Sequence, residues 1–134
     1  MVEPGISHER KLVVTEAEAI HFLGRGDARA LSTPSMIMHM EITARDAVLP
    51  FLEPGQDTVG TKVDVAHLAA TPLGMKITFR ATLKAVDRRR LTFAVEAHDE
   101  REKIGEGTHE RFIIDVARYA ERLKEKAEHN AGAG

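Results

Sequence analysis

The sequence predicts an α+β fold in which one long helix packs against a curved antiparallel sheet of about five strands, followed by a short helix. The first observation is that apolar residues recur at three- and four-residue steps in a stretch that ends near position 50. The second is that the apolar period changes to two after position 55. The segments with this shorter period are joined by short turns, which favours antiparallel neighbours. The order of elements is that of an α+β domain.

The long helix is expected to begin at Thr33 and to end near Pro50. Thr33 is a residue type that caps helices, and Pro34 suits the first helical turn. The apolar residues that follow share one side of the helix: Met36, Ile37, Met40, Ala44, Ala47 and Val48. A turn at positions 53–55 (EPG) separates this segment from the strands. Because the apolar side holds few long polar groups, we expect it to lie against the sheet.

Four strands are expected after this turn. The first covers residues 59–67 and is half-buried, with one face formed by Val59, Thr61, Val63, Val65 and His67. The next three cover about residues 75–84, 91–97 and 103–114, and residues 11–14 add a strand at an edge. In the last strand, Gly105 and Gly107 indicate a bulge or a close approach of another backbone.

A short amphipathic helix is expected to close the fold. Beyond position 115, helical spacing is kept among Arg and Lys by Val116, Tyr119, Ala120 and Leu123. We therefore expect one domain over residues 1–126 and a flexible tail over residues 127–134. A sheet of this size leaves an edge strand with open backbone groups, which a second copy can cover. A homodimer is predicted, and the sequence leaves open whether dimers pair further.

Composition excludes several classes of function. The 134 residues are too few for a two-domain enzyme. With 19 Lys and Arg against 21 Asp and Glu, the chain has no electrostatic footprint for nucleic acid or an anionic membrane. The absence of Cys excludes a thiol nucleophile, and no His-Glu-x-x-His spacing occurs, so no metal is expected. No long apolar run or signal-peptide core occurs, and we expect a cytoplasmic protein.

Three polar residues stand out because of their places in the pattern. His67 ends the apolar face of its strand, Glu41 interrupts the apolar helix, and Thr33 lies at the helix start. Each also has an ordinary structural explanation: a hydrogen-bonded core histidine, a solvated helix carboxylate and an N-cap. The pattern alone supports a candidate Glu and His pair in an α+β domain.

Several motifs, in order, carry a resemblance to a known family. They are TPSM at 33–36 with Glu41 eight residues after Thr33, VGT at 59–61, VAHLAATPLG at 65–74, RRL at 89–91, EAHD at 96–99 and IGEGTHER at 104–111. These motifs resemble the fluoroacetyl-CoA thioesterase-like family of hot-dog proteins. The resemblance implies a dimeric hot-dog fold, a long helix wrapped by an antiparallel sheet, with active sites at the subunit interface. It also implies hydrolysis of an acyl-CoA thioester, with no cofactor because CoA is part of the substrate.

The resemblance further implies roles for five residues. The catalytic Thr, Glu and His of the family fall on Thr33, Glu41 and His67, and its substrate-contacting Gly and Arg fall on Gly60 and Arg111. Glu41 would act as a base toward water or attack the thioester to give a mixed anhydride. His67 would activate water or assist the leaving thiolate. Backbone N–H groups near Thr33 would hold the oxyanion.

Helix geometry limits how these residues can meet. If Thr33 and Glu41 share one continuous helix, eight residues at about 1.5 Å each separate them by roughly 12 Å. Three arrangements remain open: the chain bends back at Thr33, the two groups act on different ends of the substrate, or one of them comes from a partner protomer. We expect Thr33 to position the substrate or to lie on the oxyanion side.

The segment at residues 20–31 bears on the substrate. The fluoroacetyl-CoA thioesterase of the family has an aromatic-rich lid before its catalytic Thr, whereas this segment is shorter and holds one aromatic residue, Phe22. We therefore expect a short or medium acyl-CoA rather than strict fluoroacetyl specificity, with the CoA or carrier-protein nature of the thioester left open. Two alternatives remain, an enoyl-thioester hydratase or dehydratase and a non-catalytic acyl-CoA or small-ligand binding protein. The arginines at positions 88–90 form a charged hairpin turn or pair with CoA phosphates.

Overall fold

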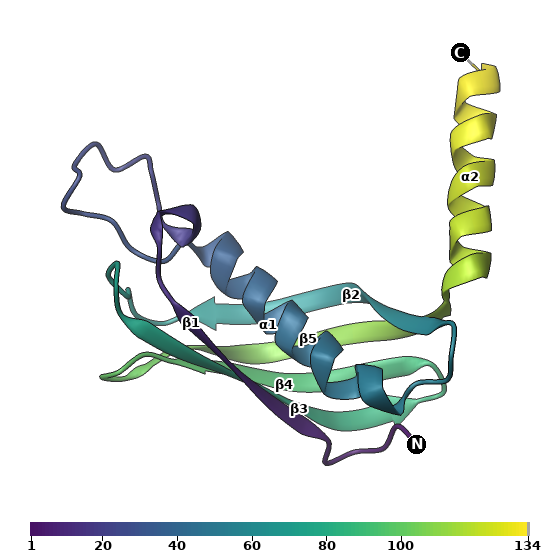
Figure 1. The fold of residues 1–134 in the computed structure, drawn as a ribbon, viewed down its shortest axis with the longest axis horizontal. Helices are drawn as coiled ribbons and strands as arrows, with labels where there is room; N and C mark the ends of the chain where they lie inside the picture. The colour runs from purple at the N-terminus through teal and green to yellow at the C-terminus, as the bar shows by residue number, and fades with distance from the viewer. Residues whose placement is uncertain (134) are drawn as a thin grey trace.

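The computed structural model describes residues 1–133, with side chains through position 130. Five strands form one sheet: β1 (Ser7–Val13), β2 (Gln56–His67), β3 (Lys76–Asp87), β4 (Arg90–His98) and β5 (Lys103–Asp115). The strand order is β1-β3-β4-β5-β2, with every neighbouring pair antiparallel. The helix α1 (Thr33–Val48) lies across one face of the curved sheet, and α2 (Val116–Ala133) follows β5 (Figure 1). The predicted α+β fold is confirmed.

The start of α1 differs by one residue from the predicted cap. Ser32 is the N-cap, and its hydroxyl accepts a hydrogen bond from the amide of Ser35 at 3.2 Å. Thr33 is therefore the first helical residue and not the cap, which leaves its hydroxyl for another partner. At the other end, α1 gives way to a 3-10 turn at Leu49–Phe51 that contains Pro50, as expected.

The core lies between α1 and the central strands. The buried side of the helix includes Met36, Met40, Ala44, Ala47 and Val48, which face alternate residues of β3 and β4 such as Ile77, Phe79, Leu83, Leu91, Phe93 and Val95. Gly105 of β5 lies directly under the helix. A Cβ atom at Gly105 would lie 2.6 Å from the sulfur of Met36 and 3.1 Å from Cε of Met40. The close approach of another backbone is seen at Gly107 instead, where a Cβ atom would meet backbone atoms of Asp64 and Val65.

A β-bulge interrupts the pairing of β2 with β5. Gly60 pairs with Arg111 and Lys62 pairs with Glu110, so Thr61 has no partner of its own in the ladder. The Thr61 hydroxyl instead donates to the carbonyl of Glu110 at 3.2 Å. One extra residue on β2 shifts the alternation of side chains between the two faces of the sheet.

The bulge changes which residues of β2 face the helix. Val63 and His67 pair with inward-facing positions of β5 and stay on the helix side, as predicted. Val59 pairs with Phe112, between two inward-facing residues of β5, and therefore points to the opposite face. The prediction of one continuous half-buried face is wrong for Val59 and for Thr61, because the pattern did not reveal the inserted residue.

The middle of β2 is uncovered on both faces. Residues 60–64 are all exposed, although they lie in the centre of a 12-residue strand. Val63 is 39% exposed even though its side chain lies on the helix side. The strand is also an edge of the sheet, so one row of its backbone groups has no strand beside it.

The helix α2 projects from the fold instead of closing it (Figure 1). It has 18 residues, more than the short helix expected, and its apolar residues Val116, Tyr119 and Leu123 are 47%, 38% and 53% exposed. The helix continues through Ala133, so positions 127–133, expected in the tail, are helical, while position 134 lies outside the described residues. Within residues 1–133, no helix is both long and apolar enough to cross a membrane.

Candidate active site

Thr33 and His67 meet at the N-terminal end of α1. The Thr33 Oγ1 atom lies 2.8 Å from Nδ1 of His67. Thr33 is in the first turn of the helix and His67 is the last residue of β2, so the start of one element is fixed to the end of the other. The second ring nitrogen of His67, Nε2, is buried and has no hydrogen-bond partner among the described residues. A buried polar atom without a partner is costly in a folded protein unless a ligand or water uses it.

The environment of His67 keeps its ring neutral. Burial lowers the pKa of His67 below its ordinary value of 6.5, and a backbone hydrogen bond with Ala69 opposes the shift in part. A neutral imidazole has one N–H donor and one acceptor nitrogen. When Nδ1 donates to the Thr33 hydroxyl, Nε2 therefore carries a lone pair that can accept a proton.

Glu41 lies two turns farther along α1, beside two residues of β5. Its Oε1 atom is 3.6 Å from Nη1 of Arg111 and 3.8 Å from Nε2 of His109. These distances place a carboxylate near a cation but are too long for hydrogen bonds. The Glu41 side chain is 38% exposed. Its oxygens therefore keep lone pairs that are open to a molecule arriving from outside the protomer.

Arg111 is a buried cation whose donors are held inside the protein. Its Nε donates to the hydroxyl of Thr58 at 2.7 Å, Nη2 donates to the Thr58 carbonyl at 2.9 Å, and Nη1 donates to Nε2 of His109 at 3.1 Å. Burial lowers the pKa of Arg111, and the negative charge of Glu41 opposes this shift. Because a guanidinium stays protonated in proteins, Arg111 supplies a fixed positive charge beside Glu41.

The hydrogen bonds of His109 determine its tautomer. Nδ1 lies 2.8 Å from the carbonyl oxygen of Lys62, which can only accept, so Nδ1 carries the proton. Nε2 faces the Arg111 guanidinium, which can only donate, so Nε2 is the acceptor. Burial lowers the pKa of His109, and Arg111 adds to the shift. His109 is therefore a neutral residue that orients the arginine.

Neither His109 nor Thr58 stands out in the sequence as a candidate site residue. One signal was available, because His109 and Arg111 occupy alternate positions on the face of β5 that also carries the buried Ile113. Polar residues repeated on a core-facing side of a strand indicate a buried network rather than solvated surface.

Gly60 lets β2 pass close to this group. A Cβ atom there would collide with Oε1 of Glu41, and it would lie 3.2 Å from Cε1 of His109 and 3.4 Å from Nη1 of Arg111. The backbone of Gly60 is not in the left-handed region, so glycine is needed here for space and not for its conformational freedom.

The five residues singled out in the sequence fall into two groups. Thr33 contacts His67, while Glu41 lies beside Gly60 and Arg111. Thr33 and Glu41 lie on one continuous helix and do not meet, and the candidate pair of Glu41 with His67 is not formed within one protomer. Within residues 1–133, no group of three or more His, Cys, Asp or Glu side chains is arranged to hold a metal ion.

Comparison with known proteins identifies the family. Residues 14–117 match the family described as "FlK: Fluoroacetyl-CoA-specific thioesterase". The chain belongs to this family. A fluoroacetyl-CoA thioesterase of Streptantibioticus cattleyicolor is 41% identical over 95 residues, which cover 71% of this chain and 68% of that protein. The chain is thus homologous to a thioester hydrolase, and the family expected from the motifs is confirmed.

Solved structures share the fold over nearly the whole chain. A mutant of FlK in complex with acetyl-CoA has a TM-score of 0.85 at 31% identity, covering 93% of this chain and 98% of the other. A hypothetical protein of Thermus thermophilus described as a thioesterase superfamily member has a TM-score of 0.87 at 28% identity, covering 100% and 98%. The FlK-family chain therefore has the hot-dog fold that the resemblance implied.

Proposed function

We propose that this FlK-family protein hydrolyses the thioester of a short or medium acyl-CoA to the free acid and CoA. The observation that carries the proposal is the state of the Glu41 carboxylate. It is held beside the buried Arg111 cation yet makes no hydrogen bond to the described residues, and it faces the uncovered part of β2. A carboxylate in this state is available to a thioester carbonyl or to a water molecule.

A second copy of the chain would complete the site. Two β2 strands pairing antiparallel about Val63 would place Lys62 opposite the partner's Asp64 and Asp64 opposite the partner's Lys62. This pairing would cover the exposed middle of β2 and join opposite charges on both sides of the two-fold axis. The complementary charges and the exposure of residues 60–64 support this homodimer.

The same pairing would bring the two groups of site residues together. Because the strands run in opposite directions, the end of one β2 lies near the beginning of the other. His67 at the end of β2, with Thr33 bonded to it, would come close to the partner's Gly60 and to the partner's Glu41. The separation of Thr33 from Glu41 in one protomer would then follow from the dimer, because each site would combine Thr33 and His67 of one protomer with Glu41 of the other.

Each group would have a defined task in hydrolysis. Glu41 would attack the carbonyl carbon or remove a proton from the attacking water, with Arg111 fixing its orientation. The neutral His67 would accept at Nε2 either the proton that Glu41 takes from the attacking water or a proton of the water that hydrolyses the Glu41 anhydride, and would pass it to the CoA thiolate to give the thiol. In the first turn of α1, Pro34 has no backbone N–H group. The N–H groups of Ser35 and Met36 already donate to Ser32. The amide of Thr33 is the one left to donate to the oxyanion.

Thiol release from a panel of acyl-CoA esters tests the proposal. Wild type should hydrolyse some of the acetyl, fluoroacetyl, aromatic and medium-chain esters, and Glu41→Gln and His67→Ala should each lower kcat by at least about a hundredfold. The matched controls Glu106→Gln and His129→Ala change exposed residues outside the site and should retain wild-type rates. Binding of CoA without hydrolysis of any ester would instead indicate a binding protein. A loss of enoyl absorbance when an enoyl thioester is the substrate would indicate a hydratase.

A further inference from the structure

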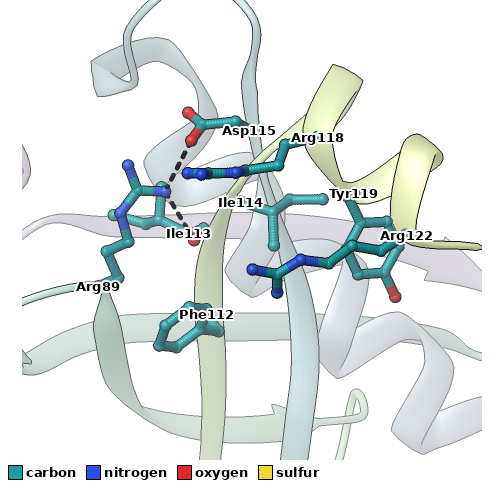
Figure 2. Close-up of a pocket in the computed structure, with 8 residues that line it drawn as sticks. All are labelled: Arg89, Phe112, Ile113, Ile114, Asp115, Arg118, Tyr119 and Arg122. Atoms are coloured by element: carbon teal, nitrogen blue, oxygen red, sulfur yellow. Dashed lines mark hydrogen bonds and ion pairs between the residues drawn. The ribbon is translucent and has the colours of Figure 1, made fainter.

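Arginines gather around two aromatic rings at the end of the sheet from which α2 leaves. A pocket of about 260 Å³ is lined by Arg89, Phe112, Ile113, Ile114, Asp115, Arg118, Tyr119 and Arg122 (Figure 2). An adjoining hollow shares Arg89 and Phe112 and adds Asp87, Arg88 and Arg90. Asp115 is the one carboxylate that lines the pocket, against three guanidinium groups, so the pocket carries an excess of positive charge.

Two of these guanidinium groups lack an anion among residues 1–130. Arg89 is 3.4 Å from a carboxylate oxygen of Asp115 and donates to the carbonyl of Ile113 at 3.3 Å. Arg118 and Arg122 form no ion pair with the residues whose side chains are described. They stand four residues apart on one face of α2, and Figure 2 shows both side chains reaching into the pocket.

The aromatic rings beside them add a second kind of contact. Phe112 is 40% exposed and Tyr119 is 38% exposed, and both line the same pocket. Guanidinium groups bind phosphate through paired hydrogen bonds, and aromatic rings stack with the flat face of a base. Together they match a nucleotide with phosphate groups, which is the chemistry of the adenosine bisphosphate part of CoA.

We propose that this arginine pocket, lined by Arg89, Arg118 and Arg122 with Phe112 and Tyr119, binds the nucleotide of an acyl-CoA whose thioester reacts at the partner's Thr33–His67 pair. The proposal rests on the proposed acyl-CoA hydrolysis and on the antiparallel pairing of β2. Within one protomer, α2 leaves the sheet at the end opposite to the start of α1 and the end of β2 (Figure 1), so the pocket is distant from the Thr33–His67 pair. Gln56 at the start of β2 pairs with Asp115 just before α2, so the antiparallel pairing of two β2 strands would place each pocket beside the end of the partner's β2, which carries His67.

Charge reversal on α2 tests the pocket. Arg118→Glu/Arg122→Glu should raise the KM for the acyl-CoA about tenfold or more relative to the KM for the acyl-pantetheine ester, which lacks the nucleotide. Binding of adenosine 3′,5′-bisphosphate, measured by calorimetry, should weaken by a similar factor. Lys124→Glu, on the opposite side of the same helix, is the control matched in charge to the single variant Arg122→Glu, and it should leave both quantities unchanged.

Binding and kinetics separate this inference from the proposed function. Binding of adenosine 3′,5′-bisphosphate that depends on the arginines supports the pocket even if no ester is hydrolysed. Hydrolysis with equal KM ratios in wild type and the double variant overturns it. So does equal displacement of the bisphosphate by inorganic phosphate at the same concentration, which would indicate an unspecific anion patch.

A mixed dimer tests the contribution of the partner. His67→Ala and Arg118→Glu/Arg122→Glu chains, expressed together with different tags and purified as the heterodimer, give one site with both changes and one site with neither. Recovery of the wild-type KM for acyl-CoA supports a pocket that serves the partner's site. Activity with the raised KM of the double variant would place the pocket and His67 of one chain in the same site, and would overturn the proposal.

Discussion

At the scale of single residues, the candidate site depends on how little room surrounds the Glu41 carboxylate. Gly60 leaves the space that Glu41 occupies, while His109 and Thr58 hold the Arg111 guanidinium that faces it. Each of the three guanidinium nitrogens of Arg111 donates to an acceptor on Thr58 or His109, which makes the buried charge tolerable. The position of Glu41 is therefore sensitive to changes that add even one carbon atom to β2.

Gly60→Ala is expected to lower activity without unfolding the protein. The added methyl group would displace the Glu41 carboxylate, and we expect kcat for thioester hydrolysis to fall by about tenfold to a hundredfold. The end of the Glu41 side chain is partly exposed and can move, so the melting temperature should change by only a few degrees. A large fall in melting temperature together with the loss of activity would mean that Gly60 serves the fold and not the carboxylate.

Some residues of the candidate site could be predicted from the sequence and others could not, for physical reasons. Thr33, Glu41, His67, Gly60 and Arg111 were found through the family motifs, whereas periodicity alone supported only a Glu and His pair. Thr58, which accepts from Arg111, was missed because a contact between strands that are far apart in the chain leaves no local spacing to read. The role of Ser32 was missed because two adjacent hydroxyl residues are equally good caps by composition.

At the scale of elements, alternation and turn residues were enough to place the strands. Turns that contain Gly, Pro and Asp separate β2, β3, β4 and β5, and each strand lies within a few residues of its predicted position. The bulge in β2 was not predictable, because an inserted residue leaves a sequence that still alternates when read without its partner strand. The length of α2 was underestimated, because its outer part lacks the buried contacts that would mark it.

Acidification is expected to destabilise the protein through its buried histidines. Burial lowers the pKa of His39, His67 and His109 below 6.5, so the unfolded chain binds more protons than the folded chain as pH falls through 6.5. The contribution of these histidines to the free energy of unfolding is complete above pH 6.5. It is lost as the pH falls toward their pKa values in the folded state. Urea unfolding at pH 7.5 and 5.5 should show a lower free energy of unfolding at pH 5.5, by at most about 1.4 kcal/mol for each histidine.

The two carboxylates with lowered pKa values, Asp57 and Asp99, do not interfere with this measurement. The pKa values of Asp57 and Asp99 are also lowered, by the Arg45 hydrogen bond at Asp57 and by the hydrogen bonds that outweigh burial at Asp99, but these groups titrate below pH 3.8. His109→Gln removes one titrating group, so its pH dependence should be smaller than that of wild type. An equal dependence in the two proteins would show that His109 does not contribute.

At the scale of the whole molecule, the single chain has two features that a second copy would explain. The middle of β2 is open on both faces, and α2 stands away from the sheet with an exposed apolar side. The other edge strand, β1, is shorter and alternates exposed with half-buried positions. The unequal edges favour β2 as the strand that pairs.

Charge exchange on β2 tests this pairing. Asp64→Lys would set like charges opposite each other at both symmetric positions of the dimer, and should raise its dissociation constant about tenfold. Exchanging both residues, Lys62→Asp/Asp64→Lys, should restore the wild-type constant. Sedimentation equilibrium measures all three proteins. Identical constants for the single and double exchange would rule out the register centred on Val63.

The bulge at Thr61 also sets a rule for changing this protein. Removing or adding one residue within positions 58–61 would exchange the faces of the strand, turning the Gly60 position outward or the positions beyond it away from the helix. A surface loop absorbs such a change in length, but in this strand it changes the face of the sheet to which each side chain points. A library that varies residue identities in β2 can retain the site, whereas one that includes insertions or deletions there will lose it.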